Sequence, residues 1–194
     1  MRRSGRNTSM TTVILLIVVV IAYFFFRNNG STANLSPNQA SPGATSAAVT
    51  GTIQWGHQAK TSGCQVNGKL PDRACTPGDI MPNATKAEIC QSGYASSVRN
   101  VTTQEKDAVY SEYGIASHTS GEYEVDHLVS LELGGSNDIS NLWPEAASPT
   151  PGFHQKDEVE NYVHEQVCSG AISLADAQKQ IATNWLAIYQ NMPK

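Results

Sequence analysis

The first fifty residues contain no acidic side chain, and the chain as a whole has no internal repeat and no Cys-x-x-Cys pair. Fifteen glycines and nine prolines in 194 residues are too few for a collagen-like chain, and a hydrophobic content of 40% is too high for a fully disordered one. A single long apolar run also excludes a polytopic membrane protein. These absences leave one ordinary domain with an appendage.

Charge is divided unevenly along the chain. Residues 1–50 carry four arginines, whereas residues 51–194 carry nine Lys and Arg against seventeen Asp and Glu, a formal net charge of −8. All five histidines and all four cysteines lie in this acidic part. Such a balance excludes a polybasic nucleic-acid coat protein.

The N-terminal residues are typical of an export signal with an anchor. A basic cytoplasmic segment at residues 1–9 precedes a predicted transmembrane signal-anchor at 10–27, where residues 10–26 would form about 25 Å of helix. Because the arginines precede the apolar run, we expect a single-pass protein with a cytoplasmic N-terminus and an extracytoplasmic domain, periplasmic or at the cell surface. The alternative is a signal peptide cleaved near residues 31–33, which would release a secreted protein.

Residues 28–50 predict a flexible linker. They are rich in Ser, Thr, Asn, Ala, Gly and Pro, carry no charge and offer almost no large apolar side chain. Such a composition buries too little surface to offset the conformational entropy lost on folding. The domain is therefore expected to span residues 51–194.

Four cysteines in an exported domain predict two disulfides. Three pairings are open, and we favour Cys64–Cys75, which would clip an irregular Gly- and Pro-rich stretch, together with Cys90–Cys168, which would join two helix ends. The spacing disfavours a cysteine-bound metal.

Apolar periodicity and capping residues predict helices over 85–90, 102–113 and 154–167 and from residue 173 onward. Extended segments are expected over 122–133 and 141–144, and Pro144 should keep the second of them from being a central paired strand for long. The order of elements predicts a small, disulfide-stapled α+β domain.

Residues 124–160 hold the side chains with the most chemistry. Asp126 offers a hard oxygen that suits Mg²⁺ or Mn²⁺, and His154 offers an imidazole nitrogen that also suits Zn²⁺ or Ni²⁺. His127, with an ordinary pKa near ~6.5, can take a proton from water, so activity is expected to decline below roughly pH 6. Neighbouring side chains such as Asp126 and His127 point to opposite faces of an ideal strand.

Four short motifs, in this order, resemble the HNH endonuclease motif: Glu124-Val125-Asp126-His127-Leu128-Val129, Leu133-Gly134-Gly135-Ser136-Asn137-Asp138, Asn141-Leu142 and His154-Gln155-Lys156. The wider chain is similar to small exported bacterial proteins called HNH-like. The resemblance implies a ββα-metal core within residues 122–168, with two strands and a helix around one divalent ion.

The resemblance also implies roles for individual residues. His127 would be the general base, Asp126 and His154 metal ligands, and Asn141 either a ligand or a brace for the loop that holds the base. Apart from the resemblance, Lys156 is a candidate for contact with the phosphate in the transition state, or alternatively a solvated helix lysine, and Arg99 is a candidate phosphate contact. His154 has the alternative of a plain helix-start residue.

Three functions are compatible with these patterns. The first is a membrane-anchored, extracytoplasmic endonuclease that uses one divalent ion to hydrolyse phosphodiester bonds of DNA or RNA. The second, favoured by the acidic domain, is a non-catalytic ββα-metal-fold module for binding or assembly at the cell envelope. The third is a disulfide-stapled envelope protein whose motif is coincidental. Oligomeric state and an inhibitor or immunity partner are left open.

Overall fold

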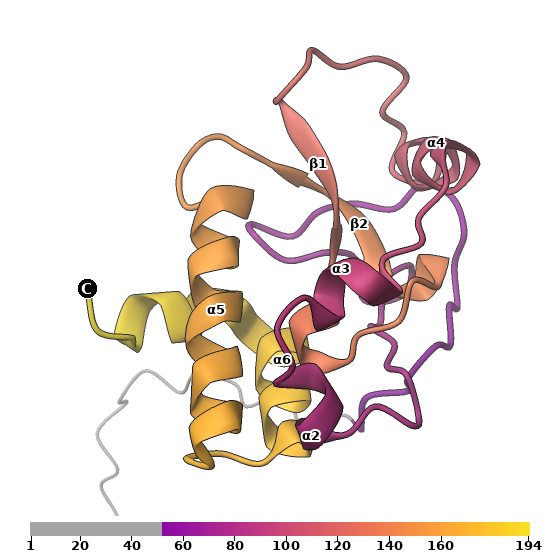
Figure 1. Ribbon diagram of the computed structural model, residues 1–194. Helices are drawn as coiled ribbons and strands as arrows, with labels where there is room; N and C mark the ends of the chain where they lie inside the picture. The colour runs from indigo at the N-terminus through magenta and orange to yellow at the C-terminus, as the bar shows by residue number, and fades with distance from the viewer. Residues whose placement is uncertain (1–51) are drawn as a thin grey trace, which may run out of the picture. The chain divides into compact units, whose positions relative to one another are not determined.

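Two long helices and a short β-hairpin dominate residues 52–194, the part of the chain that the computed structural model describes (Figure 1). The predicted basic segment, signal-anchor and linker, at residues 1–9, 10–27 and 28–50, lie outside the described residues. Within residues 52–194, no helix is both long and apolar enough to cross a membrane.

Three short helices precede the hairpin: α2 (Lys86–Ile89), α3 (Tyr94–Val98) and α4 (Thr103–Glu112). The predicted helices over 85–90 and 102–113 are confirmed, and each begins with a capping box, at Thr85 and Thr102. Helix α3 was not predicted from the sequence. It is one turn long, and its residues show no apolar stripe because none of them is buried.

The hairpin pairs β1 (Tyr123–His127) with β2 (Leu142–Ala146) in antiparallel register, so that Asp126 lies opposite Trp143. The prediction of an extended segment up to residue 133 is wrong beyond His127. There the chain turns away into the 3-10 helix η1 (Leu131–Leu133), and its apolar side chains are buried in a loop rather than on one face of a strand. Pro144 is accommodated because β2 pairs on one side only.

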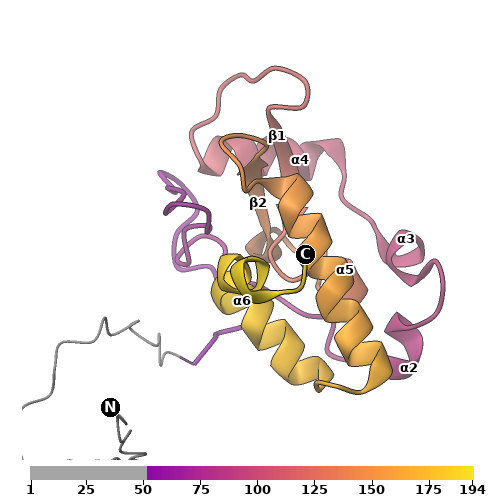
Figure 2. The ribbon, with the colours of Figure 1, turned by 90° about the vertical axis from the view of Figure 1, so that its left-hand side faces the viewer.

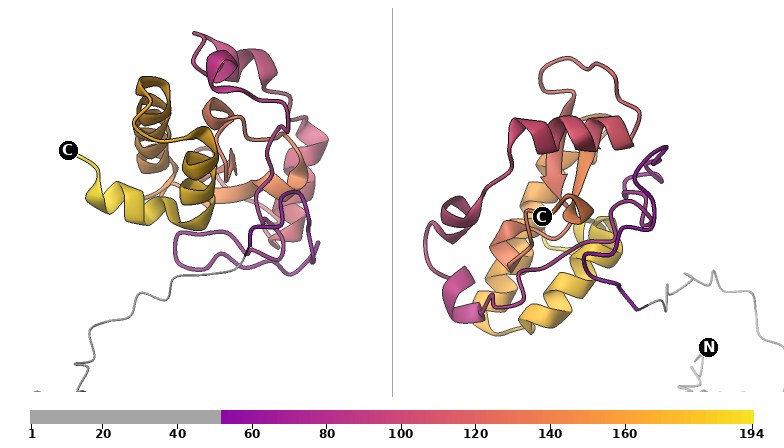
Figure 3. Two further views of the ribbon diagram at one scale, coloured as in Figure 1. Left: turned by 90° about the horizontal axis from the view of Figure 1, so that it is seen from below. Right: turned by 90° about the vertical axis from the view of Figure 1, so that its right-hand side faces the viewer.

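Helices α5 (Phe153–Ser169) and α6 (Leu174–Asn191) confirm the predictions for 154–167 and for the C-terminus. They pack against each other, as Figure 2 shows. Trp143 of β2 and Trp185 of α6 belong to the main core with the apolar stripe of α5. On the other face of the hairpin, α4 lies across both strands (Figure 3), where Val109 packs with Val125 and Leu142. The hairpin is therefore covered on both faces.

Both favoured disulfides are confirmed. Cys64 and Cys75 clip the irregular N-terminal stretch of the domain, with an S–S distance of 2.02 Å. Cys90, at the end of α2, is bonded to Cys168 in the last turn of α5. The mixed α and β content with two disulfides agrees with the predicted fold class.

Candidate active site

The C-terminal end of β1 directs two adjacent side chains to opposite sides of the hairpin. The carboxylate of Asp126 faces α5, where its Oδ2 accepts a hydrogen bond from Lys156 Nζ at 2.6 Å. The ring of His127 faces the loop after η1, where Nε2 lies 3.2 Å from Asn137 Oδ1. This is the alternation that a strand imposes, and it gives the two residues separate surroundings.

Lys156 is enclosed between α5 and the hairpin, with 0% of the residue exposed. Its ammonium donates to three oxygens: Asp126 Oδ2 at 2.6 Å, the backbone oxygen of His127 at 2.7 Å, and Glu160 Oε1 one helical turn along α5. The alternative of a solvated helix lysine is therefore wrong. Since all three N–H groups are engaged inside the protein, the ammonium also has none left for a substrate phosphate in this structure.

Glu145 of β2 completes this group from the strand opposite β1. Only 2% of the residue is exposed, and neither carboxyl oxygen has a hydrogen-bond donor among the described residues. Burial raises the pKa of Glu145 to about 10, and the charge of the Asp126 carboxylate adds to this increase, so Glu145 carries a proton at neutral pH. We call Lys156, Asp126, Glu145 and Glu160 the Lys156 centre.

Ionisation within the Lys156 centre follows from burial and from the single cation. Burial alone would raise the pKa of Asp126, but the adjacent Lys156 ammonium holds it below its ordinary value. Burial raises the pKa of Glu160 to about 7, an effect that Lys156 opposes. Burial would lower the pKa of Lys156, yet the surrounding carboxyls raise it, so the ammonium stays charged. One positive charge thus faces three carboxyl groups.

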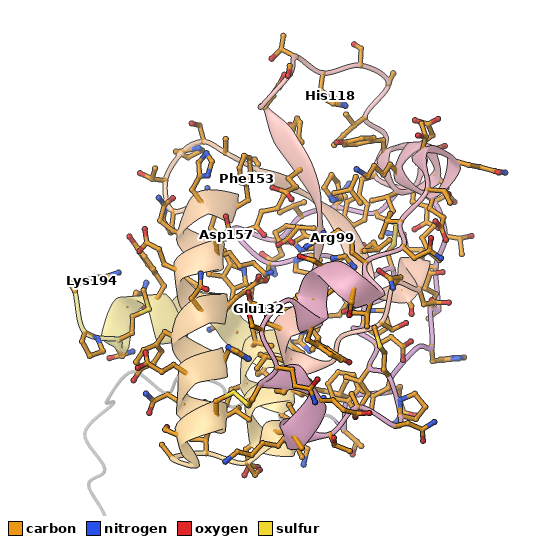
Figure 4. The ribbon with its side chains drawn as sticks, viewed as in Figure 1. Arg99, His118, Glu132, Phe153, Asp157 and Lys194 are labelled. Carbon is orange, nitrogen blue, oxygen red and sulfur yellow. A yellow bond between two sulfur atoms is a disulfide. The ribbon has the colours of Figure 1, made fainter. Side chains whose placement is uncertain are left out.

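More acidic side chains gather around the Lys156 centre. Burial, and next the charge of Asp126, raise the pKa of both Glu124 and Asp157. Glu132 has a buried carboxyl oxygen with no partner among the described residues. Figure 4 shows Asp157 on the side of α5 that faces α3 and Arg99 near the end of α3. The region therefore has more negative than positive charge.

His127 is held neutral and in one tautomer. Burial lowers its pKa to about 4. The amide of Asn137 has a fixed orientation, because Oδ1 accepts from Asn100 N at 3.1 Å and Nδ2 donates to Val98 O at 2.8 Å. Asn137 therefore presents an acceptor to His127, so Nε2 carries the proton and Nδ1 keeps its lone pair. No hydrogen bond to Nδ1 is found within residues 52–194.

Asn137 was part of the motif but was not assigned a role from the sequence. Asn137 lies near His127 because the loop between η1 and β2 folds back toward β1. The spacing of residues in the sequence carries little information on the path of this loop. The only signal was a polar amide ten residues beyond a histidine within a glycine-containing loop.

Asn141 braces the loop between β1 and β2. Its Oδ1 accepts from Val129 N at 2.9 Å and from Asp79 N at 3.3 Å, and its Nδ2 donates to Val129 O at 3.0 Å and to Ser136 O at 2.8 Å. The side chain is 0% exposed. These four bonds use the full capacity of an amide. Of the two alternatives for Asn141, metal ligand and loop brace, the four bonds support the brace. They leave no lone pair of the amide oxygen for an ion.

The same loop requires both of its adjacent glycines. Gly134 ends η1 at a φ of 71°, in the left-handed region. A Cβ at Gly135 would overlap the backbone oxygen of Val129. The loop therefore closes tightly enough for Asn141 to reach across it.

His154 lies in the first turn of α5, exposed, with its ring centroid 4.3 Å from that of Phe153. Among the described residues, three side chains of metal-binding type come within 4.8 Å of one another only at Cys90, His164 and Cys168. The two cysteines of that group form a disulfide, so they offer no thiolate to an ion in the oxidised protein. The structure thus brings Lys156 to Asp126 and leaves the His127 ring on the other face of the hairpin. It does not bring His154 into a three-residue group with Asp126.

Comparison with protein-family models, with curated proteins and with solved structures finds no match to this chain. The assignment of function consequently depends on the site itself.

Proposed function

We propose that the protein is a membrane-anchored, extracytoplasmic endonuclease of the HNH type, which hydrolyses phosphodiester bonds of DNA or RNA with the help of one divalent ion. The observation that carries this proposal is the packing of the motif. A strand ends at Asp126 and His127, an antiparallel strand follows, and the next helix reaches back to an oxygen of Asp126 through Lys156. This order of two strands and a helix supports the ββα core that the sequence resemblance implies.

The Lys156 centre offers carboxyl oxygens, the donors that a hard divalent cation prefers, although no three of its carboxyl groups lie within 4.8 Å of one another. Its side-chain oxygens come from carboxyl groups, and both oxygens of Glu145 lack a donor among the described residues. The Lys156 ammonium already binds an oxygen of Asp126 and an oxygen of Glu160. Asp126 and Glu160 would hold the ion, and an all-oxygen set favours Mg²⁺ or Mn²⁺ over Zn²⁺ or Ni²⁺. Once bound, such an ion supplies charge stabilisation at the scissile phosphate and the leaving oxygen.

His127 has the properties of a general base in this proposal. Because its pKa is about 4, the ring is neutral throughout the physiological range. Nδ1 accepts the proton of the attacking water, while Asn137 holds Nε2–H. Arg99 follows α3 on the surface, and its charge acts on both His127 and Glu124. Its exposed guanidinium would bind a substrate phosphate.

One observation favours the second candidate, a non-catalytic binding or assembly module. The side chains of Asn141 and Lys156 are saturated by internal hydrogen bonds, and His127 is only 2% exposed. A purely structural use of the motif would look the same. This candidate predicts a folded, disulfide-bonded protein with no hydrolytic activity.

A cleavage assay separates the two candidates. The oxidised full chain, in a mild non-ionic detergent, is incubated with supercoiled plasmid and with structured RNA, in Mg²⁺, Mn²⁺, Zn²⁺, Ni²⁺ or EDTA. The nuclease proposal predicts cleavage that needs a divalent ion and stops in EDTA. A folded protein that cleaves neither substrate with any ion would support the non-catalytic module instead.

A further inference from the structure

Three aromatic rings gather at the N-terminal end of β1, the end opposite to His127. His118 belongs to the loop between α4 and β1 (Figure 4), and its ring centroid lies 4.4 Å from that of Tyr110 of α4, at an interplanar angle of 37°. Tyr123, the first residue of β1, stands nearly perpendicular to the same imidazole, with the two centroids 6.1 Å apart. We call Tyr110, His118 and Tyr123 the aromatic cluster.

The aromatic cluster is anchored in the core on one side and open on the other. Tyr110 packs against the small core that Val109, Val125 and Leu142 form. His118, at the other end of the stack, is exposed. Because flat rings stack favourably on one another, an exposed ring at the end of a stack offers its free face to a further ring.

A cavity of about 630 Å³ adjoins the open end of this stack. Tyr110 and His118 line it together with Asp107 and Ser111 of α4 and residues 114–117 of the following loop, and none of these described lining residues is a lysine or an arginine. The volume lies within the range of small-molecule sites, about 300–1,000 Å³. A carboxylate such as that of Asp107 repels a phosphate but accepts a hydrogen bond from the amino group of a base such as cytosine. The cavity therefore suits a nucleobase rather than a phosphate.

The aromatic cluster and His127 lie on the same face of β1. Side chains two residues apart in a strand share a face, so Tyr123, Val125 and His127 all point to the side on which α4 packs. Tyr123 is four positions before His127, a distance of about 13 Å at ~3.3 Å per residue. About four nucleotides of a stacked strand, at ~3.4 Å each, span this distance. A strand whose scissile phosphate lies at His127 thus reaches the aromatic cluster with a base a few nucleotides away.

We propose that the aromatic cluster is a base-stacking subsite in which His118 stacks on an unpaired base of the substrate, so that the substrate is single-stranded DNA or RNA or an unpaired region of a longer nucleic acid. This inference rests on the proposed function and names its substrate class. In a duplex the neighbouring bases cover both faces of each base, so a base must leave the helix before it stacks on a protein ring. Stacking also gives an acidic domain a source of affinity besides contact with phosphates.

Binding of fluorescent oligonucleotides, measured by anisotropy in EDTA, tests the subsite without reference to cleavage. The oxidised full chain, in a mild non-ionic detergent, is titrated into three probes: a short DNA strand of cytosine and adenine, the RNA of the same sequence, and the DNA strand annealed to its complement. We expect at least one single strand to bind at least about fivefold more tightly than the duplex.

Variants of His118 separate stacking from charge. His118→Ala removes the ring and should weaken the binding of the single strand at least about fivefold. His118→Phe keeps a flat ring without its nitrogens and should retain most of the binding, because stacking needs only the face of the ring. A loss with phenylalanine as large as that with alanine would refute stacking. His57→Ala, at an exposed histidine that does not line the cavity, is the matched control and should leave the affinity unchanged.

The outcomes distinguish the subsite from the function on which it rests. If the wild type binds the duplex as tightly as both single strands, or binds no probe, the subsite is refuted, and the cleavage assay still decides on the nuclease. Unchanged binding of the single strand by His118→Ala would also refute it. Selective binding of a single strand that depends on His118, in a protein that cleaves neither plasmid nor RNA, would support the subsite and contradict the nuclease.

Discussion

Replacement of Asn141 by alanine should destabilise the domain more than any other single amide change at the site. The side chain makes four hydrogen bonds, and three of them hold the ends of the β1–β2 loop together through Val129 and Ser136. The fourth ties this loop to Asp79. Alanine would leave two backbone donors and two backbone acceptors without their partner in a place that is 0% exposed.

The magnitude follows from these four bonds. At a net contribution of about 1 kcal/mol for each hydrogen bond, Asn141→Ala should lower the free energy of unfolding by about 4 kcal/mol. Asn141→Asp should cost at least as much, because one carboxylate oxygen would face the backbone oxygens of Val129 and Ser136. Asn161→Ala, on the exposed side of α5, should change stability by less than about 0.5 kcal/mol.

The assay is urea unfolding of the oxidised protein, followed by the fluorescence of the buried Trp143 and Trp185. The two alternatives for Asn141 differ most in the aspartate variant. A metal ligand would tolerate aspartate, since a carboxylate binds divalent ions well. A stable Asn141→Asp protein, unfolding at the wild-type urea concentration, would refute the brace.

Three further predictions concern pH and covalent links. Glu145→Gln should stabilise the protein by about 1–3 kcal/mol at pH 7 relative to wild type. In the wild type the pKa of Glu145 is raised to about 10 in the folded state, so the free energy of unfolding falls as the pH rises above the pKa that Glu145 has in the unfolded state. An equal effect of the substitution at pH 5 and pH 8 would contradict this. The NMR titration of His127 should have its midpoint near pH 4, which moves the expected acid limit of activity below the pH 6 predicted from an ordinary histidine; a midpoint above pH 6 would show that the ring is not buried as described. Replacing Cys90 and Cys168 by serine should cost about 4.5 kcal/mol, against about 2.8 kcal/mol for Cys64 and Cys75, since the first pair closes a loop of 78 residues and the second one of 11; the reverse order in urea unfolding would contradict the loop-length argument.

The helices and the disulfides were predictable because their signals are local. Capping boxes at Thr85 and Thr102 begin two helices at the expected residues. The pairing of Cys90 with Cys168 followed once the short link between Cys64 and Cys75 was favoured. The end of β1 was missed because the apolar residues after His127 are buried by a loop, and alternation alone does not distinguish that loop from a strand.

The enclosure of Lys156 was missed, although the sequence carries a signal for it. Lys156 lies three residues before Val159 and seven before Val163, so it continues the buried stripe of α5 toward the N-terminus of the helix. A lysine on an apolar stripe needs a buried partner, and Asp126 supplies it. The partner itself was unpredictable, since the two residues are 30 positions apart and meet only through the hairpin.

The proposed role of His127 as the base of a metal-dependent nuclease is tested by a cleavage assay with the His127→Ala variant. His164, whose ring bonds to Ile89 O away from the Lys156 centre, provides the control variant His164→Ala. In the plasmid and RNA assay with Mg²⁺ or Mn²⁺, we expect cleavage by the wild type and by His164→Ala, and none by a folded His127→Ala protein. Full cleavage by His127→Ala would show that His127 is not the base.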